Sequence, residues 1–183
     1  MANNKQKRIN RNNRKRGSAF EKRVADYLDM DVVPYSGSNS RFGWGDVRDT
    51  VWLGECKNIT PNGHKITIKT EWIYKNEERA KQIDHIPFLA WMPAGSPNKF
   101  ILLDIDVFTK LNMKSNHIKI LENKSHNTKN IILHLNENYM KIASKAGNCV
   151  ELHTNDMVWF LMNIETFKKR INEIGLKGER ITI

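Results

Sequence analysis

Gly45-Asp46-Val47-Arg48 and Val51-Trp52-Leu53-Gly54-Glu55-Cys56-Lys57 read as the two strands of a β-hairpin, with a turn near Asp49-Thr50. Successive side chains of a strand point to opposite faces. Glu55 and Lys57 therefore project from one face and Cys56 from the other. Asp46 stands at the start of the neighbouring strand. The hairpin is expected to bring two carboxylates and one amine together at an edge of a β-sheet.

These side chains suit a hard divalent cation. Mg²⁺ prefers few carboxylates together with waters and substrate oxygens, and Mn²⁺ is the expected substitute. We expect Asp46 and Glu55 to be metal ligands, the backbone carbonyl of Cys56 to be a further one, and Lys57 to orient the attacking water or stabilise charge. An ordinary solvent-facing pair of Glu55 and Lys57 is the alternative, but a charge without a role is costly in a mostly apolar strand.

The charge of the chain predicts an acidic partner. Its 183 residues include 30 Lys and Arg against 20 Asp and Glu, which gives a net charge of +10 and a pI near 9.6. With the carboxylates at the hairpin, this favours a protein that acts on a polyanion, most simply DNA, over a charge that only aids solubility.

Several classes of protein are excluded by what the sequence lacks. It has no apolar run of about 18 residues, no apolar signal core and no zinc-ligand spacing. The cysteines, Cys56 and Cys149, do not make a disulfide framework. We therefore expect a cytoplasmic protein with no membrane partner and no small-molecule cofactor.

Residues 1–16 are basic and contain no acid, which predicts a flexible arm that contacts phosphates; a merely solvated tail is the alternative. Ser18-Ala19-Phe20-Glu21 then matches a capping box that opens a helix to about Asp29. The cations of the arm are Lys5, Lys7, Arg8, Arg11, Arg14, Lys15 and Arg16.

The rest of the chain mixes strand and helix patterns. In the Gly- and Ser-rich loop 36–45, Arg41 offers a phosphate contact and Trp44 a stacking or packing surface. Cys149 follows Gly147-Asn148, which is expected to form a turn. Strands are predicted at 32–35, 66–68, 88–92, 100–103, 131–135, 150–152 and from 158, and helices at 71–82, 106–111 and 166–174.

Part of the chain resembles the PD-(D/E)XK nuclease superfamily, in detail the archaeal-type Holliday junction resolvases and their phage-borne relatives. The resemblance spans residues 15–92, under half of the chain. It is carried by Lys15-Arg16-Gly17-Ser18-Ala19-Phe20-Glu21, Tyr35-Ser36-Gly37-Ser38, Asp46 and Leu53-Gly54-Glu55-Cys56-Lys57. The chain departs from the pattern at Lys22, where the resolvases have arginine, and at Tyr35, where they have a basic residue.

The resemblance implies an α/β, restriction-endonuclease-like core, with a central mixed sheet of four or five strands flanked by helices. It implies that Glu21 reaches the metal site from the first helix, although Glu21 also fits the capping box with Ser18. It further implies a homodimer acting on branched DNA. The residues that it and the loop assign to DNA binding are Lys15, Arg16, Lys22, Ser36, Ser38, Arg41 and Trp44.

The expected organisation is the arm at 1–16, a nuclease core at 17–111 and an α+β C-terminal extension at 112–183 packed on that core. The expected function is Mg²⁺-dependent hydrolysis of phosphodiester bonds at four-way DNA junctions, with Glu21, Asp46, Glu55 and Lys57 as catalytic residues. Two alternatives stay open. One is a repair or restriction-like nuclease on duplex, nicked or flapped DNA, and the other is a non-catalytic nucleic-acid-binding protein.

Overall fold

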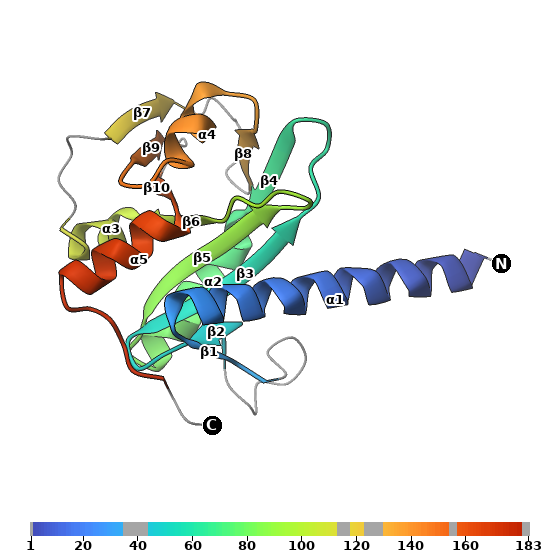
Figure 1. Cartoon of the computed structure of the whole chain (residues 1–183), viewed down its shortest axis with the longest axis horizontal. Helices are drawn as coiled ribbons and strands as arrows, with labels where there is room; N and C mark the ends of the chain where they lie inside the picture. Colours follow the sequence, from blue (N-terminus) through green and yellow to red (C-terminus); the bar gives the residue numbers. More distant parts are fainter. Residues whose placement is uncertain (1, 35–43, 113–117, 123–129, 154–156, 181–183) are drawn as a thin grey trace.

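The computed structural model describes residues 2–34, 44–112, 118–122, 130–153 and 157–180 (Figure 1). Its elements, in chain order, are α1 (Ala2–Leu28), β1 (Asp31–Val32), β2 (Val47–Arg48), β3 (Trp52–Ile59), β4 (Lys65–Lys69), α2 (Thr70–Gln82), β5 (Ile86–Pro93), β6 (Phe100–Asp104), α3 (Ile105–Lys110), β7 (Ile118–Glu122), β8 (Asn130–His134), α4 (Asn138–Ala143), β9 (Cys149–His153), β10 (Val158–Asn163) and α5 (Ile164–Glu173).

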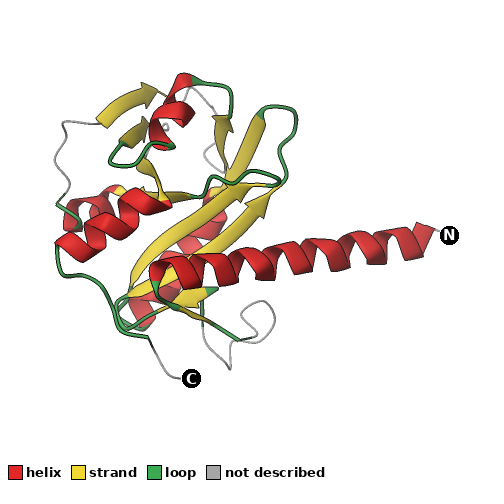
Figure 2. Cartoon of the chain, in the orientation of Figure 1, coloured by secondary structure: helices red, strands yellow, loops and turns green. Residues whose placement is uncertain are grey.

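The prediction of a central mixed sheet flanked by helices is confirmed (Figure 2). The sheet has eight strands in the order β1-β2-β3-β5-β6-β10-β9-β7, so the expectation of four or five strands was wrong. The pairs β3–β5 and β7–β9 are parallel and the other neighbours are antiparallel. A separate ribbon pairs β4 with β8.

The sheet is larger than the four or five strands expected of the core because strands from the C-terminal part of the chain pair with it directly. β10 pairs with β6, where Phe160 lies opposite Leu103, and β9 then pairs with β10. Residues after 112 therefore supply β7, β9 and β10 to the same sheet that carries β3. Cys149 begins β9 directly after Gly147-Asn148, and the positive φ of 84° at Gly147 agrees with the turn predicted there.

Both faces of the sheet are covered, as the alternation along β5 shows. Phe88, Ala90 and Met92 join a core cluster with residues of α1 and α5, whereas Leu89 and Trp91 join a second cluster with residues of α2, α4, β4 and β8. Figure 1 shows α1 and α5 on the near face and α2 behind the sheet. The near-continuous apolar run of β5 is thus explained by burial on both sides.

The N-terminal segment differs from its prediction. Residues 2–16 belong to α1, so the arm is helical rather than irregular. Ser18 and Glu21 lie inside this helix, and the capping-box interpretation was therefore wrong. α1 ends where Asp29 takes a left-handed φ of 64° and the Met30 N–H donates to the Ala25 carbonyl at 2.9 Å.

Among the residues that the structure describes, no helix is long and apolar enough to cross a bilayer. Cys56 and Cys149 are both buried and carry free thiols.

Candidate active site

Asp46 is fixed by backbone contacts on two sides. Its N–H donates to the Gly54 carbonyl at 2.8 Å, and its carbonyl accepts from the Val33 N–H at 2.9 Å. Gly45, just before it, has a φ of 77°, a conformation that L side chains rarely adopt. The Asp46 residue is 8% exposed, and its Oδ2 accepts the Cys56 N–H at 2.7 Å. The carboxylate is therefore held against β3.

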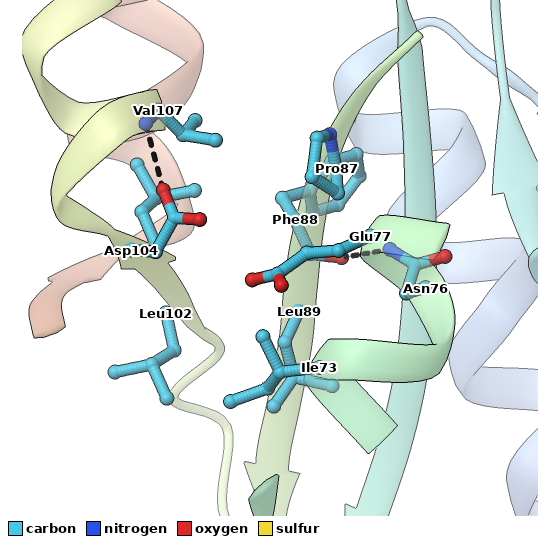
Figure 3. Close-up of a pocket in the computed structure, with 10 residues that line it drawn as sticks. Ile73, Asn76, Glu77, Pro87, Phe88, Leu89, Leu102, Asp104 and Val107 are labelled. Carbon is cyan, nitrogen blue, oxygen red and sulfur yellow. Dashed lines mark hydrogen bonds between the residues drawn. The ribbon is translucent and has the colours of Figure 1, made fainter. Parts of the chain in front are cut away.

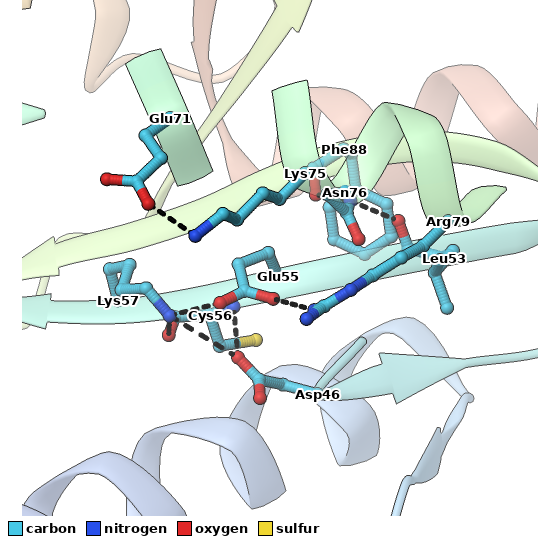
Figure 4. Close-up of polar contacts among 10 residues, drawn as sticks. All are labelled: Asp46, Leu53, Glu55, Cys56, Lys57, Glu71, Lys75, Asn76, Arg79 and Phe88. Carbon is cyan, nitrogen blue, oxygen red and sulfur yellow. Dashed lines mark hydrogen bonds and ion pairs between the residues drawn. The ribbon is translucent and has the colours of Figure 1, made fainter. Parts of the chain in front are cut away.

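Glu55 and Lys57 lie on the same side of β3, as the alternation of strand side chains requires. The Lys57 ammonium donates to the Glu55 carboxylate and, at 3.3 Å, to the Cys56 carbonyl. Its Nζ also lies 3.8 Å from Asp46 Oδ2. Figure 4 shows this ammonium among three oxygen-bearing groups that come from two neighbouring segments. The structure thus brings together three of the predicted catalytic residues and the predicted carbonyl.

The site lies where the pairing of β3 changes. The ladder between β2 and β3 joins Val47 to Gly54 and Arg48 to Leu53, whereas β5 pairs with β3 along its whole length. From Glu55 onward, β3 has passed the end of the β2 ladder, and the Asp46 carboxylate takes the Cys56 N–H. The polar cluster therefore lies where β3 is paired with β5 on one side and has left the β2 ladder on the other.

The surroundings of this cluster keep Lys57 positively charged and disfavour the charged form of Glu55. Burial lowers the pKa of Lys57, but the charges of Glu55 and Asp46 more than reverse this and raise it. Burial, followed by the charge of Asp46, raises the pKa of Glu55, although Lys57 and Arg79 oppose this. The two carboxylates, Asp46 and Glu55, are thus balanced by two cations, Lys57 and Arg79.

Glu21 approaches this cluster from α1. It is half-buried, and burial, followed by the charge of Asp46, raises its pKa to about 7; Lys57 lowers it and Glu55 raises it further. Glu21 thus lies within electrostatic range of the other three side chains. Since it has no capping role, its carboxyl group is available to the site.

Helix α2 supplies three residues that the sequence interpretation missed. Arg79 Nη1 lies 3.8 Å from Glu55 Oε2, and Lys57 Nζ lies 5.5 Å from the centre of the Trp72 ring. Asn76, 2% exposed, donates to the carbonyls of Leu53 at 3.0 Å and Phe88 at 3.1 Å, which ties α2 to β3 and β5. Positions 72, 76 and 79 are four and three residues apart, so the helix predicted at 71–82 could have indicated that these three side chains share one face.

The residues predicted to bind DNA fall into three groups. Lys15, Arg16 and Lys22 are exposed on α1. Trp44 is half-buried directly before Gly45. Ser36, Ser38 and Arg41 lie outside the described residues.

The oxygen donors of the cluster suit a metal that is shared with a substrate. Within the described ranges, no group of three or more His, Cys, Asp or Glu side chains is placed to hold a metal ion. Mg²⁺, however, usually takes one or two carboxylates and fills its other positions with waters and substrate phosphates. Asp46, Glu55 and the Cys56 carbonyl already surround a cation, the Lys57 ammonium. These hard oxygens fit Mg²⁺ or Mn²⁺ held jointly with a substrate, and not a resident structural metal.

A second acidic pair lies elsewhere, in a small pocket between α2, β5, β6 and α3 (Figure 3). Burial, followed by the charge of Asp104, raises the pKa of Glu77 to about 7. Asp104 is engaged as the N-cap of α3, since its Oδ1 accepts the Val107 N–H at 2.7 Å. The residues that line this pocket are mostly apolar and include no lysine or arginine, unlike the cluster on β3.

The resemblance of residues 15–92 to PD-(D/E)XK nucleases stays a prediction. Comparisons of the chain with models of protein families, with curated proteins and with solved structures found no significant match.

Proposed function

We propose that this protein is a Mg²⁺-dependent DNA endonuclease with a PD-(D/E)XK, restriction-endonuclease-like core, and that four-way junctions are its favoured substrate. The observation that carries the proposal is the Lys57 ammonium held among Asp46, Glu55 and the Cys56 carbonyl at the edge of β3. Two carboxylates and an amine in this arrangement suit phosphodiester hydrolysis, which needs an oriented water and neutralisation of phosphate charge.

The residues divide this work between them. Asp46 and Glu55, with the Cys56 carbonyl, would hold the metal. Bound Mg²⁺ supplies Lewis-acid charge neutralisation on the phosphate and a more acidic water. The Lys57 ammonium stabilises the negative charge that develops on the phosphate oxygens. Arg79 holds Glu55 from the α2 side, and Glu21 adds a carboxyl group from α1.

The charge of the chain supports DNA as the substrate. A net charge of +10 attracts a polyanion over a long range, and the exposed cations of α1 lie on the helix that carries Glu21. A junction resolvase makes two symmetric cuts, so the proposal includes a C₂ homodimer.

The test compares a synthetic four-way junction with a linear duplex of matched sequence, with and without Mg²⁺. We expect paired, symmetric nicks on the junction that depend on the metal. Glu55→Gln should reduce cutting by at least about a hundredfold while DNA binding is retained or tightened, because a negative charge is removed. Glu71→Gln is the matched control, since Glu71 is exposed on α2 and forms its ion pair with Lys75, one turn further along the same helix.

Each outcome separates one rival. Equal cutting of the linear duplex would favour the repair or restriction-like alternative. Cutting at the native rate by Glu55→Gln would contradict the proposed site. DNA binding without any metal-dependent cutting by the native chain would favour the non-catalytic alternative.

A further inference from the structure

Helix α1 has two halves with different surroundings. Its buried side chains begin at Phe20, whereas every side chain from Gln6 to Arg16 is exposed. Figure 1 shows the N-terminal half extending past the end of the sheet. Within residues 6–16 there is no acid, and the cations are Lys7, Arg8, Arg11, Arg14, Lys15 and Arg16.

The exposed half carries a line of uncharged amides. Gln6, Asn10 and Asn13 are four and three residues apart, which places them on one face of a helix. The Gln6 Nε2 donates to Asn10 Oδ1 at 3.1 Å, as expected for neighbours on that face. The same spacing continues through Gly17 to Phe20, which is buried against the sheet. The amides therefore lie on the same side of α1 as Phe20, in the part of the helix that extends past the sheet.

Cations border this amide face. Lys7, Arg11 and Arg14 each follow one of the amide positions by one residue and therefore form a parallel line beside it. On the other side lies Arg16, whose Nη2 donates to Asn13 Oδ1 at 2.5 Å. Ile9 and Asn12 share that other side with Arg16, so the cations are concentrated on one side of the amide face.

This pattern fits the major groove of DNA. An α-helix with its side chains is about 10–12 Å across, and the groove is about 12 Å wide. Asn and Gln side chains form paired hydrogen bonds to adenine edges, while Lys and Arg beside them reach backbone phosphates. Residues 6–16 rise by roughly 16 Å, which spans on the order of five base-pair steps.

We propose that residues 6–16 of α1 form a recognition helix that reads base edges in the major groove through Gln6, Asn10 and Asn13. Asn10, Gly17 and Glu21 are seven and four residues apart, so the amide face points to the same side as Glu21. A duplex bound to this part of α1 would therefore lie on the side of the helix that faces the cluster on β3. The inference takes its partner, DNA, from the proposed function.

The experiment selects bound sequences from a randomised duplex library with the full-length chain, in a chelator that prevents metal-dependent cutting. The amide variant Gln6→Ala/Asn10→Ala/Asn13→Ala is compared with the charge variant Lys7→Ala/Arg11→Ala/Arg14→Ala. All six side chains are exposed and outside the core, so both variants keep the packed half of α1. Each specified base should discriminate by about tenfold in the native chain.

We expect the amide variant to lose sequence enrichment while keeping the salt dependence of binding. The charge variant should bind all sequences more weakly and keep the preferred sequence. No enrichment by the native chain, or unchanged enrichment by the amide variant, overturns the inference. Junction cutting by the native chain in Mg²⁺ is scored separately: cutting without enrichment defeats only the recognition helix, and enrichment without cutting defeats only the nuclease.

Discussion

Lys57 Nζ lies 3.8 Å from Asp46 Oδ2, although the two residues come from separate segments on either side of the hairpin turn. The ammonium and a divalent cation would compete for the same oxygens. Lys57→Met should raise the affinity of the protein for Mn²⁺, measured by calorimetry, because the competing ammonium is gone. It should also abolish cutting, because the charge that stabilises the phosphate oxygens is lost.

Lys75→Met is the control for this prediction. Lys75 is an exposed lysine of α2 that pairs with Glu71. Its removal should leave both cutting and Mn²⁺ affinity near the native values. Weaker Mn²⁺ binding by Lys57→Met would show that the ammonium does not occupy the cation position.

The packing around Gly54 leaves no room for a side chain. A Cβ at this position would lie 2.3 Å from Phe88 Cζ and 2.6 Å from Val47 Cγ2. Gly54→Ala should therefore lower the free energy of unfolding by about 1–3 kcal/mol or more, because a buried aromatic ring and β2 must both move. Denaturant unfolding with circular dichroism measures the change.

Gly17→Ala is the opposite case. A Cβ at Gly17 would meet only Glu21 Oε1, at 3.8 Å, which is ordinary contact. Alanine inside α1 should stabilise the helix by about 0.5–1 kcal/mol. A loss of stability in Gly17→Ala comparable to that of Gly54→Ala would mean that crowding is not what distinguishes the two sites.

Local patterns predicted the elements around the site well. The alternation of Trp52 to Lys57 placed Glu55 and Lys57 on one face, since strand side chains alternate whatever the tertiary context. The helix after Glu71 and the strand at Phe88–Met92 were likewise expected close to where α2 and β5 lie.

Features that depend on distant pairing were not predictable. The eight-stranded sheet depends on β10 lying beside β6, which no local pattern specifies. Arg79 reaches Glu55 only because Asn76 ties α2 to the carbonyls of β3 and β5. The helical arm was missed because asparagines and like charges disfavour a helix, whereas extending one already nucleated by the packed half of α1 needs no new nucleus.

The carboxyl pair of Glu77 and Asp104 should make stability depend on pH. The native pKa of Glu77, about 7, is raised above its ordinary value of 4.5, so the native state holds a proton that the unfolded state releases between these values. The contribution of this group to stability is therefore fully present below about pH 4.5 and is lost as the pH rises through about 7. Glu77→Gln, which cannot ionise, should be more stable than the native chain at about pH 8, as measured by denaturant unfolding.

The difference between Glu77→Gln and the native chain should vanish near pH 4.5. Other groups around this pocket also carry charge, since Lys81 lowers the pKa of Glu77 and Asp106 raises it, and both stay in place in the variant. Glu78→Gln, at an exposed position of the same helix, is the control and should follow the native pH dependence. Equal stability of Glu77→Gln and the native chain at about pH 8 would contradict the prediction.

Removal of residues 2–14 should separate DNA affinity from folding. The deletion takes away five cations, and residues 6–14 are exposed, whereas the buried residues of the described part of α1 begin at Phe20. The thermal midpoint should therefore hardly change. The logarithm of the DNA-binding constant should fall less steeply with the logarithm of salt concentration, by about 0.9 for each phosphate that the shortened helix no longer neutralises and by no more than about 4.5. An unchanged salt slope, measured by titration between low and moderate salt, would show that this half of α1 makes no phosphate contacts.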